Sequence, residues 1–316
     1  MIISTNVVIA DIQITFWTDH SSDSDYLGDI FLYHSGKEKT WSGTRKYHDV
    51  IISSSKEKLY LPIGKPLIWD GYINENVSAK WYNHVGEDEN IISIRNDILI
   101  KHMPQRNLTI CYLSETKARF FKSHRPLLAN YIFFLLHSIT SMHGKYCIHA
   151  SCAAKNGFAY LFLGKSGEGK STMSMILGAA GWKYMGDDLV FVSFDENGEV
   201  IIDSFLSKPK LFNTKLKMKD SIDVIKKQHF NYSYREKLGV ILKLQRTYVS
   251  KESILLPASQ AEVFTWLMNS SNNIKIHYHQ QQWIDICEKA SSLSTHTLMF
   301  ADKEYFNPDI LFNALR

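Results

Sequence analysis

The sequence reads Gly164-Lys165-Ser166-Gly167-Glu168-Gly169-Lys170-Ser171 near the middle of the chain, which is a complete G-x-x-x-x-G-K-S motif. An apolar run at 158–163 precedes the motif, and a helical pattern at 170–180 follows it. The glycines allow the backbone to curl so that successive N–H groups point at phosphate oxygens, and the positive end of the following helix favours anions. The stretch therefore predicts a strand, a phosphate-binding loop and a helix, which are the core of an α/β nucleotide-binding domain.

The side chains of the motif predict how a nucleoside triphosphate is held. Lys170 is expected to reach the β- and γ-phosphates, and the Ser171 hydroxyl is expected to ligate Mg²⁺. The sequence contains no Asn-Lys-x-Asp motif for guanine, and ATP with Mg²⁺ is the expected pair. The residues predicted to bind the nucleotide are Gly164, Lys165, Ser166, Gly167, Glu168, Gly169, Lys170, Ser171 and Thr172.

Two acidic residues, Asp187 and Asp188, follow the helix at the point where a strand is expected to return to the nucleotide site. Phosphoryl transfer to a hydroxyl needs Mg²⁺ to offset the triphosphate charge, and it needs a carboxylate that accepts the proton of the acceptor. Two adjacent carboxylates divide naturally between these two tasks, with Asp187 as a candidate metal ligand and catalytic residue, and Gly186 allows the backbone to bend beside them. A solvated turn that carries two acids is the alternative.

Three further residues are candidates for the same chemistry. His149 lies in the apolar run 146–153, on a strand expected to pair with the one that leads into the loop. There its imidazole would contact the γ-phosphate or orient a carboxylate, and a core histidine is the alternative. Asp203 follows the apolar residues 200–202, which allows a metal-binding strand or, as the favoured interpretation, a plain strand end. Arg235 is a candidate for stabilising transition-state charge.

The pattern of the whole chain predicts two domains. Short apolar or alternating runs such as 7–16 fill the first part, which predicts a β-rich domain over 1–122, with substrate recruitment as a possible role. Apolar residues at three- and four-residue spacings after Pro126 predict a helix that opens the second domain, 123–316. Asn156-Gly157 predicts a hairpin turn within it. The expected fold class is α/β, a P-loop domain preceded by a β-rich domain.

The composition is that of a globular protein, since 45% of the 316 residues are hydrophobic and 22% are charged. The 36 Lys and Arg residues against 32 Asp and Glu give a net charge of +4, far below the basic excess of a dedicated nucleic-acid binder. The four cysteines form no CxxC pair, no signal-peptide pattern is present, and no apolar run approaches the roughly 20 residues that span a bilayer. We expect a cytoplasmic protein that binds neither nucleic acid nor membrane.

Together these motifs resemble the HPr kinase/phosphorylase family and the wider set of HPr-kinase-like serine kinases, whose core is similar to the nucleotide domain of phosphoenolpyruvate carboxykinase. The resemblance rests on the G-x-S-G-x-G-K-S loop, on His149 before it and on the Asp187-Asp188 pair after it, and it covers about 143–193. It implies that His149, Lys170 and Asp188 occupy the family's catalytic positions. It also implies that Asp188 accepts the substrate proton and that Ser171 binds magnesium.

Ala150 follows the histidine where the HPr enzymes are expected to carry an acid or Gly, and their downstream acidic, Gly-containing motif is not found. The pattern is more similar to divergent members, some of which phosphorylate a precursor peptide in natural-product pathways, as lasso-peptide kinases do. The resemblance implies an ATP- and Mg²⁺-dependent kinase for a Ser or Thr hydroxyl of a peptide or small protein. A small-molecule P-loop kinase and a nucleotide-responsive binding protein without phosphoryl transfer are the alternatives. The sequence leaves the acceptor, the reverse phosphorylase reaction and a homo-oligomeric state open.

Overall fold

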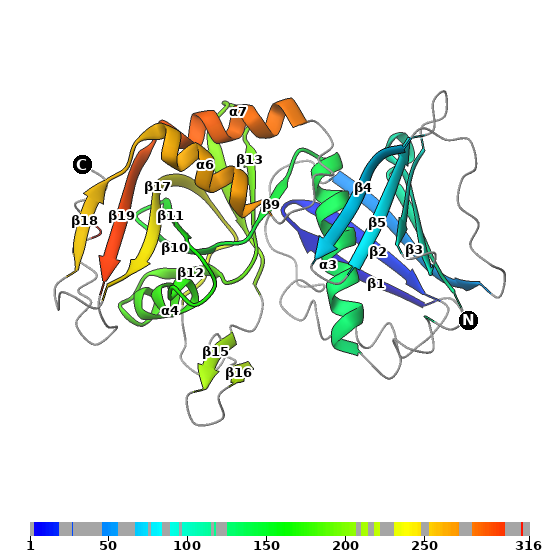
Figure 1. The fold of residues 1–316 in the computed structure, drawn as a ribbon, viewed down its shortest axis with the longest axis horizontal. Helices are drawn as coiled ribbons and strands as arrows, with labels where there is room; N and C mark the ends of the chain where they lie inside the picture. Colours follow the sequence, from blue (N-terminus) through cyan, green and yellow to red (C-terminus); the bar gives the residue numbers. More distant parts are fainter. Residues whose placement is uncertain are drawn as a thin grey trace. The chain divides into compact units, whose positions relative to one another are not determined.

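The computed structural model has mixed α/β structure and divides into two compact units, Met1–His143 (unit 1) and Gly144–Arg316 (unit 2) (Figure 1). The division falls after helix α3 (Arg125–Met142), whereas the boundary predicted from the sequence falls before this helix. The structure describes residues 3–18, 27, 46–55, 67–74, 77–83, 89–94, 97–114, 117, 125–206, 210–213, 218–221, 231–247, 253–271, 280–300 and 311.

Unit 1 contains an eight-stranded sheet, in agreement with the β-rich pattern of this part of the sequence. β3 runs parallel to both of its neighbours, and the remaining pairs are antiparallel. A short 3-10 helix, η1 (Pro104–Arg106), connects the two strands on either side of it in the sequence. The strand order is β1 (Ile3–Ile9), β2 (Ile12–Thr18), β3 (Lys46–Ser55), β8 (Leu108–Ser114), β7 (Ile98–Met103), β6 (Asn90–Ile94), β5 (Val77–Asn83) and β4 (Leu67–Asn74).

The first hairpin divides a run that the sequence pattern indicates as one strand, 7–16. Ala10 and Asp11 join β1 to β2, and both have positive φ values, 49° and 66°. Two consecutive left-handed residues form the backbone of a type I′ turn, for which Asn-Gly is the usual sequence. The sequence gives no turn signal at this point, because alanine rarely adopts this conformation.

Helix α3 agrees with the helix predicted from the apolar spacing after Pro126, and this proline lies in its first turn. The buried hydrophobic side chains of its described part are Ile132, Phe134, Leu135, Leu136 and Ile139, and His137, Ser138, Thr140 and Ser141 are buried as well. None of the helices that the structure describes is both long enough and apolar enough to cross a membrane.

Unit 2 is built on a nine-stranded mixed sheet. Seven strands follow one another in the order β12 (Lys183–Gly186), β10 (Ser151–Lys155), β11 (Phe158–Leu163), β17 (Arg235–Arg246), β14 (Val200–Ser204), β13 (Val190–Phe194) and β9 (Tyr146–Ile148). β19 (Ser294–Phe300) also pairs with β17, and β18 (Ile254–Pro257) pairs with β19. A separate hairpin consists of β15 (Lys210–Asn213) and β16 (Met218–Ser221). The hairpin predicted at Asn156-Gly157 joins β10 to β11, and both turn residues have positive φ.

Strand β17 organises this sheet because it pairs with three others. One of its edges lies along β11 in parallel, while the other edge pairs first with β14 and further along with β19. β11, β17 and β19 are therefore all parallel, and their carboxyl ends meet at the same edge of the sheet. Ligands of α/β proteins commonly bind outside such an edge. Residues 164–169 follow β11 at this edge.

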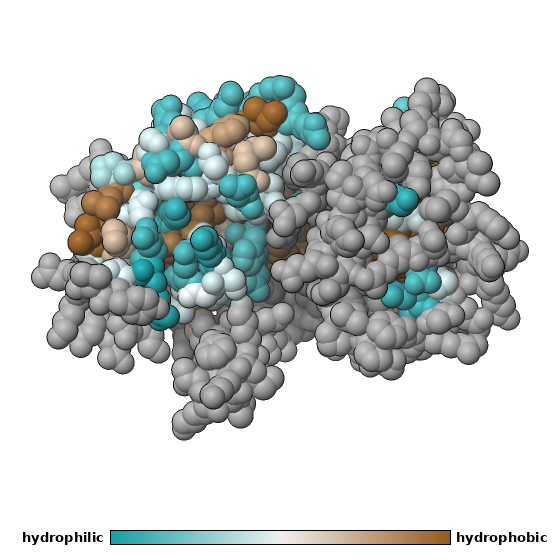
Figure 2. Space-filling view, viewed as in Figure 1, coloured by the Kyte–Doolittle hydropathy of each residue, from teal (hydrophilic) through white to brown (hydrophobic). Residues whose placement is uncertain are grey.

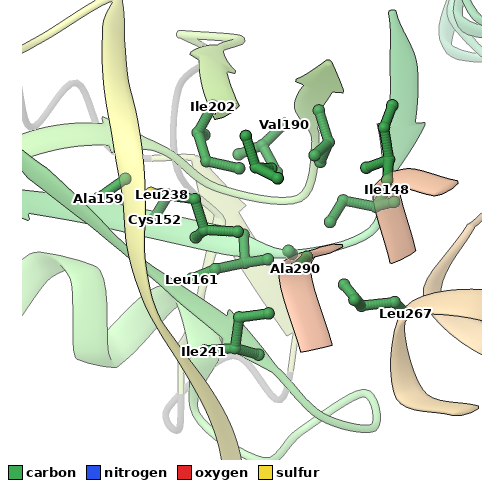
Figure 3. Close-up of a cluster of buried hydrophobic side chains, with 14 of the residues drawn as sticks. Ile148, Cys152, Ala159, Leu161, Val190, Ile202, Leu238, Ile241, Leu267 and Ala290 are labelled. Atoms are coloured by element: carbon green, nitrogen blue, oxygen red, sulfur yellow. The ribbon is translucent and has the colours of Figure 1, made fainter. Parts of the chain in front are cut away.

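Helices cover the sheet of unit 2 on both faces, which gives three layers (Figure 1). Met173 and Leu177 of α4 (Lys170–Ala179) pack with Tyr160 and Phe162 on one face. The opposite face packs against α6 (Gln260–Ser270) and α7 (Gln280–Ser291), in the cluster that Figure 3 shows. Cys152 and Cys287 belong to this second cluster, and burial raises the pKa of both thiols, so they pack as small apolar side chains.

The outer helix α7 is amphipathic. Its buried apolar residues, Trp283, Ile286, Cys287 and Ala290, recur at spacings of three and four and therefore share one face, which also buries Ser291. The opposite side of the helix is exposed, and Figure 2 shows a largely hydrophilic surface there. The same view shows a hydrophobic patch over β18, where Ile254 and Leu256 are exposed.

Candidate active site

The candidate site lies where the chain passes from β9 to β10 and from β12 to β13, because the antiparallel pairing is interrupted at both places. Ile148 at the end of β9 faces Val190 at the start of β13, and Cys152 of β10 faces Gly186 at the end of β12. Between these two pairs, 149–151 and 187–189 are not paired with each other as strands, and the contact of the His149 ring with the Asp188 carbonyl oxygen joins the two segments. We call these six residues the paired interruption. It contains His149, Asp187 and Asp188, which the sequence assigned to one site from their order relative to the loop.

The backbone at the paired interruption is held in unusual conformations. Gly186 has a φ of +150°, and a Cβ atom there would lie 3.0 Å from the Phe205 carbonyl oxygen, so only glycine fits. Asp188 has a φ of +70°, in the left-handed region that aspartate and asparagine adopt more readily than other side chains. The bend expected beside the two carboxylates is therefore present, and Asp188 takes part in it. Asp187 is buried, with 1% of its surface exposed, whereas Asp188 is half-buried.

His149 is fixed at both its backbone and its ring. Its N–H donates to the Ser270 carbonyl at the end of α6 at 2.8 Å, and its Nδ1 lies 2.9 Å from the Asp188 carbonyl oxygen. Because a carbonyl oxygen only accepts hydrogen bonds, Nδ1 carries the proton in this contact. The contact therefore fixes the orientation of the imidazole ring beside Asp188. His149 is half-buried.

The loop 164–169 connects β11 to α4, which is the strand and helix context that the motif requires. Gly167 and Gly169 have φ values of +89° and +91°. A Cβ atom at Gly169 would lie 2.9 Å from the Phe300 ring at the end of β19, so this glycine is required by both its conformation and its surroundings. The first N–H groups of α4 have no partner within the helix, and a curled loop in front of them is a setting that accepts anions.

The side chain of Lys170 lies along its own loop. It is 6% exposed, and its Nζ donates to the carbonyl oxygens of Gly164 at 2.8 Å and Lys165 at 3.2 Å. The Glu168 carboxylate accepts a hydrogen bond from the Lys165 N–H at 2.7 Å, which stabilises the curled backbone of the loop. Of the other predicted nucleotide-binding residues, Ser166 and Gly167 are exposed, and Ser171 and Thr172 are half-buried in the first turn of α4.

One residue that the sequence analysis does not name connects the loop to the paired interruption. The Ser151 hydroxyl donates to the carbonyl oxygen of Lys170 at 2.7 Å. Ser151 lies two residues after His149, so this bond joins the histidine segment to the first turn of α4. An apolar run that contains a serine gives no signal of such a contact, because the partner lies across a loop.

The donor atoms near the loop fit magnesium in chemical type. Ser171 supplies a hydroxyl oxygen and Asp187 a carboxylate, and Mg²⁺ prefers such oxygen ligands. No cluster of three His, Cys, Asp or Glu side chains suited to a metal occurs in the described part of the chain.

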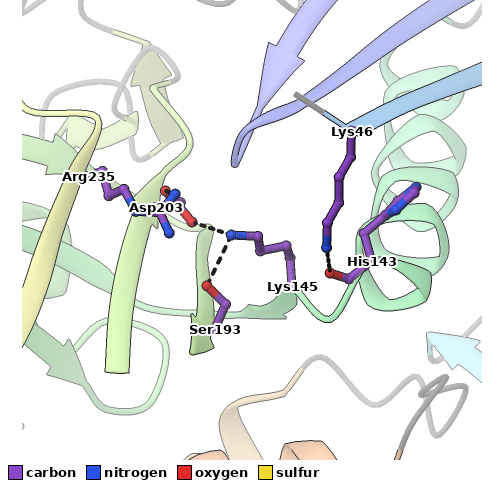
Figure 4. Close-up of polar contacts among 6 residues, drawn as sticks. All are labelled: Lys46, His143, Lys145, Ser193, Asp203 and Arg235. Atoms are coloured by element: carbon purple, nitrogen blue, oxygen red, sulfur yellow. Dashed lines mark hydrogen bonds and ion pairs between the residues drawn. The ribbon is translucent and has the colours of Figure 1, made fainter. Parts of the chain in front are cut away.

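Asp203 has a different environment from the loop residues (Figure 4). It is 2% exposed in β14, and its carboxylate lies 3.3 Å from the Lys145 Nζ and 3.4 Å from Arg235 Nη1. Lys145 also donates to the Ser193 hydroxyl at 3.2 Å. These contacts favour a structural ion-pair network over a metal-binding strand. They also place the Arg235 guanidinium against Asp203.

No family model matches the chain, and no curated protein matches it. Among the solved structures that match at a distance, one covers about half of this chain. It is described as the Hpr(Ser) kinase/phosphatase from Coxiella burnetii, with 13% sequence identity over 54% of this chain and 92% of that chain, and with a TM-score of 0.31. This likeness is too distant to support an argument about function, which depends on the residues of the site.

Proposed function

We propose that the chain is an ATP- and Mg²⁺-dependent kinase that transfers the γ-phosphate to a Ser or Thr hydroxyl of a peptide or small protein. The observation that carries the proposal is the convergence of three separate sequence motifs. The Ser151 bond to Lys170 and the His149 contact with Asp188 bring the glycine loop, the histidine and the two carboxylates to one place. Phosphoryl transfer depends on such positioning and on electrostatic stabilisation.

The loop and the start of α4 supply the phosphate-binding groups. Backbone N–H groups of the loop hold the phosphates, and Lys170 turns from its loop carbonyls to the β- and γ-phosphates. Ser171 and Asp187 would hold Mg²⁺, which supplies neutralisation of the phosphate charge when bound.

Asp188 is the proposed proton acceptor. The acceptor oxygen forms a bond to the γ-phosphorus as the bond between this phosphorus and the leaving ADP oxygen breaks, and the hydroxyl proton passes to the Asp188 carboxylate. His149 holds the Asp188 backbone through Nδ1 and so helps to orient the base.

Two features support a peptide or protein acceptor over a small metabolite. Small-molecule P-loop kinases tend to have an arginine-rich lid over the phosphates, and only three arginines, Arg235, Arg246 and Arg316, follow the loop in this sequence. Of these, Arg235 lies against Asp203. The motif pattern is also more similar to kinases of precursor peptides.

The test is intact-mass analysis of candidate peptides, encoded beside the gene, after incubation with the protein, ATP and Mg²⁺. We expect one phosphate to be added by the wild-type protein and none by Asp188→Asn. Asparagine tolerates the left-handed backbone at this position and so preserves the His149 contact while it removes the base. Equal turnover by the variant would remove Asp188 from its role, and ATP binding without transfer to any peptide or metabolite would favour a nucleotide-responsive binding protein.

A further inference from the structure

Ser151 is a polar residue at a position where an apolar one would be expected. Its side chain is 0% exposed, in a stretch of β10 whose other members, Cys152, Ala153 and Ala154, are apolar and also buried. A buried hydroxyl costs free energy unless it is hydrogen-bonded, and the Lys170 carbonyl is the acceptor that Ser151 uses. This carbonyl belongs to the first turn of α4.

Ser151 lies between the strand that leads into the loop and the segment that carries His149. Ser151 pairs with Phe162 of β11, the strand that leads into the loop. It also belongs to the paired interruption, together with His149, Asp187 and Asp188. It is therefore in contact with the start of α4 while its own chain segment carries His149, whose ring holds the Asp188 carbonyl.

We propose that Ser151 is a positioning residue, whose hydroxyl fixes the first turn of α4 relative to the paired interruption. This inference rests on the proposed kinase function and deepens it. The bond sets the distance between the residues that hold the phosphates, Lys170 and Ser171, and the proposed base, Asp188. Misplacement of reacting groups by about 1 Å can reduce a rate by about 100-fold. A single bond at this junction can therefore change the rate of phosphoryl transfer substantially.

The bond is suited to positioning because its loss leaves little else disturbed. The Lys170 carbonyl lies in α4, where an i+4 amide also serves it, so removal of the serine hydroxyl leaves no orphaned acceptor. Nucleotide affinity depends on the loop amides and on Lys170 Nζ, which Ser151 does not contact in the described structure. The expected signature is therefore a reduced kcat with an unchanged affinity for nucleotide.

The experiment compares three variants with the wild-type protein. Ser151→Ala removes the hydroxyl, and Ser151→Thr retains it on a side chain that strands favour. Ser174→Ala is the matched control, because Ser174 is also 0% exposed and also donates to a backbone carbonyl, that of Ser171 at 3.1 Å, but within α4 itself. The ADP dissociation constant is measured by calorimetry, and kcat and KM are measured with a peptide that the wild-type protein phosphorylates.

We expect Ser151→Ala to lose roughly 10- to 100-fold in kcat while its ADP affinity stays within about 2-fold of wild type. Ser174→Ala should retain the wild-type kcat, and Ser151→Thr should regain most of the loss. If Ser151→Ala and Ser174→Ala behave alike, or if ADP affinity falls in parallel with kcat, the positioning role is wrong while the kinase function stands. If the wild-type protein phosphorylates no acceptor, the proposed function is wrong and this inference falls with it.

Discussion

Asp188 combines a backbone requirement with a chemical one. Its left-handed conformation, with φ at +70°, costs free energy for most L-residues, by about 1–2 kcal/mol where no local bond compensates. The same conformation presents its carbonyl to His149 Nδ1. Strained residues of this kind persist where the surrounding structure determines them, and they concentrate at functional sites.

Two substitutions at Asp188 separate these requirements. Glycine accepts the left-handed backbone and alanine does not, so we expect Asp188→Ala to be about 1 kcal/mol less stable than Asp188→Gly in urea denaturation. Both variants lack the carboxylate, and both should lose phosphoryl transfer to the same extent. A glycine variant that retained transfer would contradict the proposed base.

Glu168 gives a second prediction at the scale of one residue. Its carboxylate braces the loop through the Lys165 N–H, and it brings a negative charge close to the proposed triphosphate site. Glu168→Gln keeps an oxygen acceptor and removes the charge. Because a charge pair near a protein surface is worth about 1 kcal/mol or more, we expect roughly fivefold tighter ATP binding in calorimetry, with the difference shrinking at high salt. Weaker binding by the glutamine variant would show that the brace needs the full charge.

At the scale of the elements, β13, β14 and β17 are joined by the network around Asp203. Asp203→Asn leaves the Lys145 ammonium, whose side chain is 5% exposed, without its nearest negative partner. Removal of one partner of a buried pair typically costs about 3–5 kcal/mol, and we expect a loss of this size in urea denaturation. Lys145→Met in the same background should regain much of it. The phosphoryl transfer activity of the folded Asp203→Asn protein should depend on Mg²⁺ as in the wild-type protein. A weakened Mg²⁺ requirement of this activity would identify Asp203 as a metal ligand.

Elements whose own residues favour their conformation could be predicted from the sequence. Elements whose conformation depends on distant strands or helices could not. Asn156-Gly157 favours a left-handed turn by its own chemistry, and the hairpin β10–β11 is present there. Ala10-Asp11 has the same backbone without the favoured residues, so its hairpin could not be predicted. The sequence also indicated one strand over 146–153, whereas the structure divides it into β9 and β10.

The same distinction applies to the site. The glycine loop, His149 and the two aspartates could be predicted because each belongs to a short motif with its own spacing. Ser151 could not, because its role depends on the register between β10 and its neighbours and on the position of α4. Four-residue β12 carries no periodicity of its own, yet its pairing with β10 places Gly186, the residue before Asp187, opposite Cys152, the residue after Ser151.

At the scale of the molecule, two buried histidines make unit 1 sensitive to acid. His48 is 2% exposed and His102 is 0% exposed, and both contact the Thr109 hydroxyl at 2.8 Å. Burial lowers the pKa of His48 to about 2, with a contribution from His143, and burial lowers that of His102 to about 3. These values lie below the ordinary 6.5, so the unfolded chain takes up protons that the folded unit does not.

We therefore expect the stability of unit 1 to fall as the pH drops below about 6.5, by up to about 1.4 kcal/mol per pH unit for each of the two histidines. Hydrogen exchange measured between pH 7 and pH 4 should show unit 1 opening before unit 2, where His296 is the described histidine whose pKa burial lowers. In His102→Asn, the slope of the unfolding free energy against pH should decrease by the contribution of one proton, because one buried imidazole ring is absent. Equal acid sensitivity of the two units would contradict this assignment.

The pairing of β17 also has a consequence for the order in which unit 2 folds. β10, β11, α4 and β12 follow one another along the chain and make contacts between near neighbours, which form quickly. β17 begins only at Arg235, and it inserts between β11 and β14, so its pairing must close a long loop first. During synthesis, the ribosome releases the glycine loop, His149 and both aspartates well before the strand that completes their sheet. The residues of the proposed site are thus brought together early, and their rigid support arrives late.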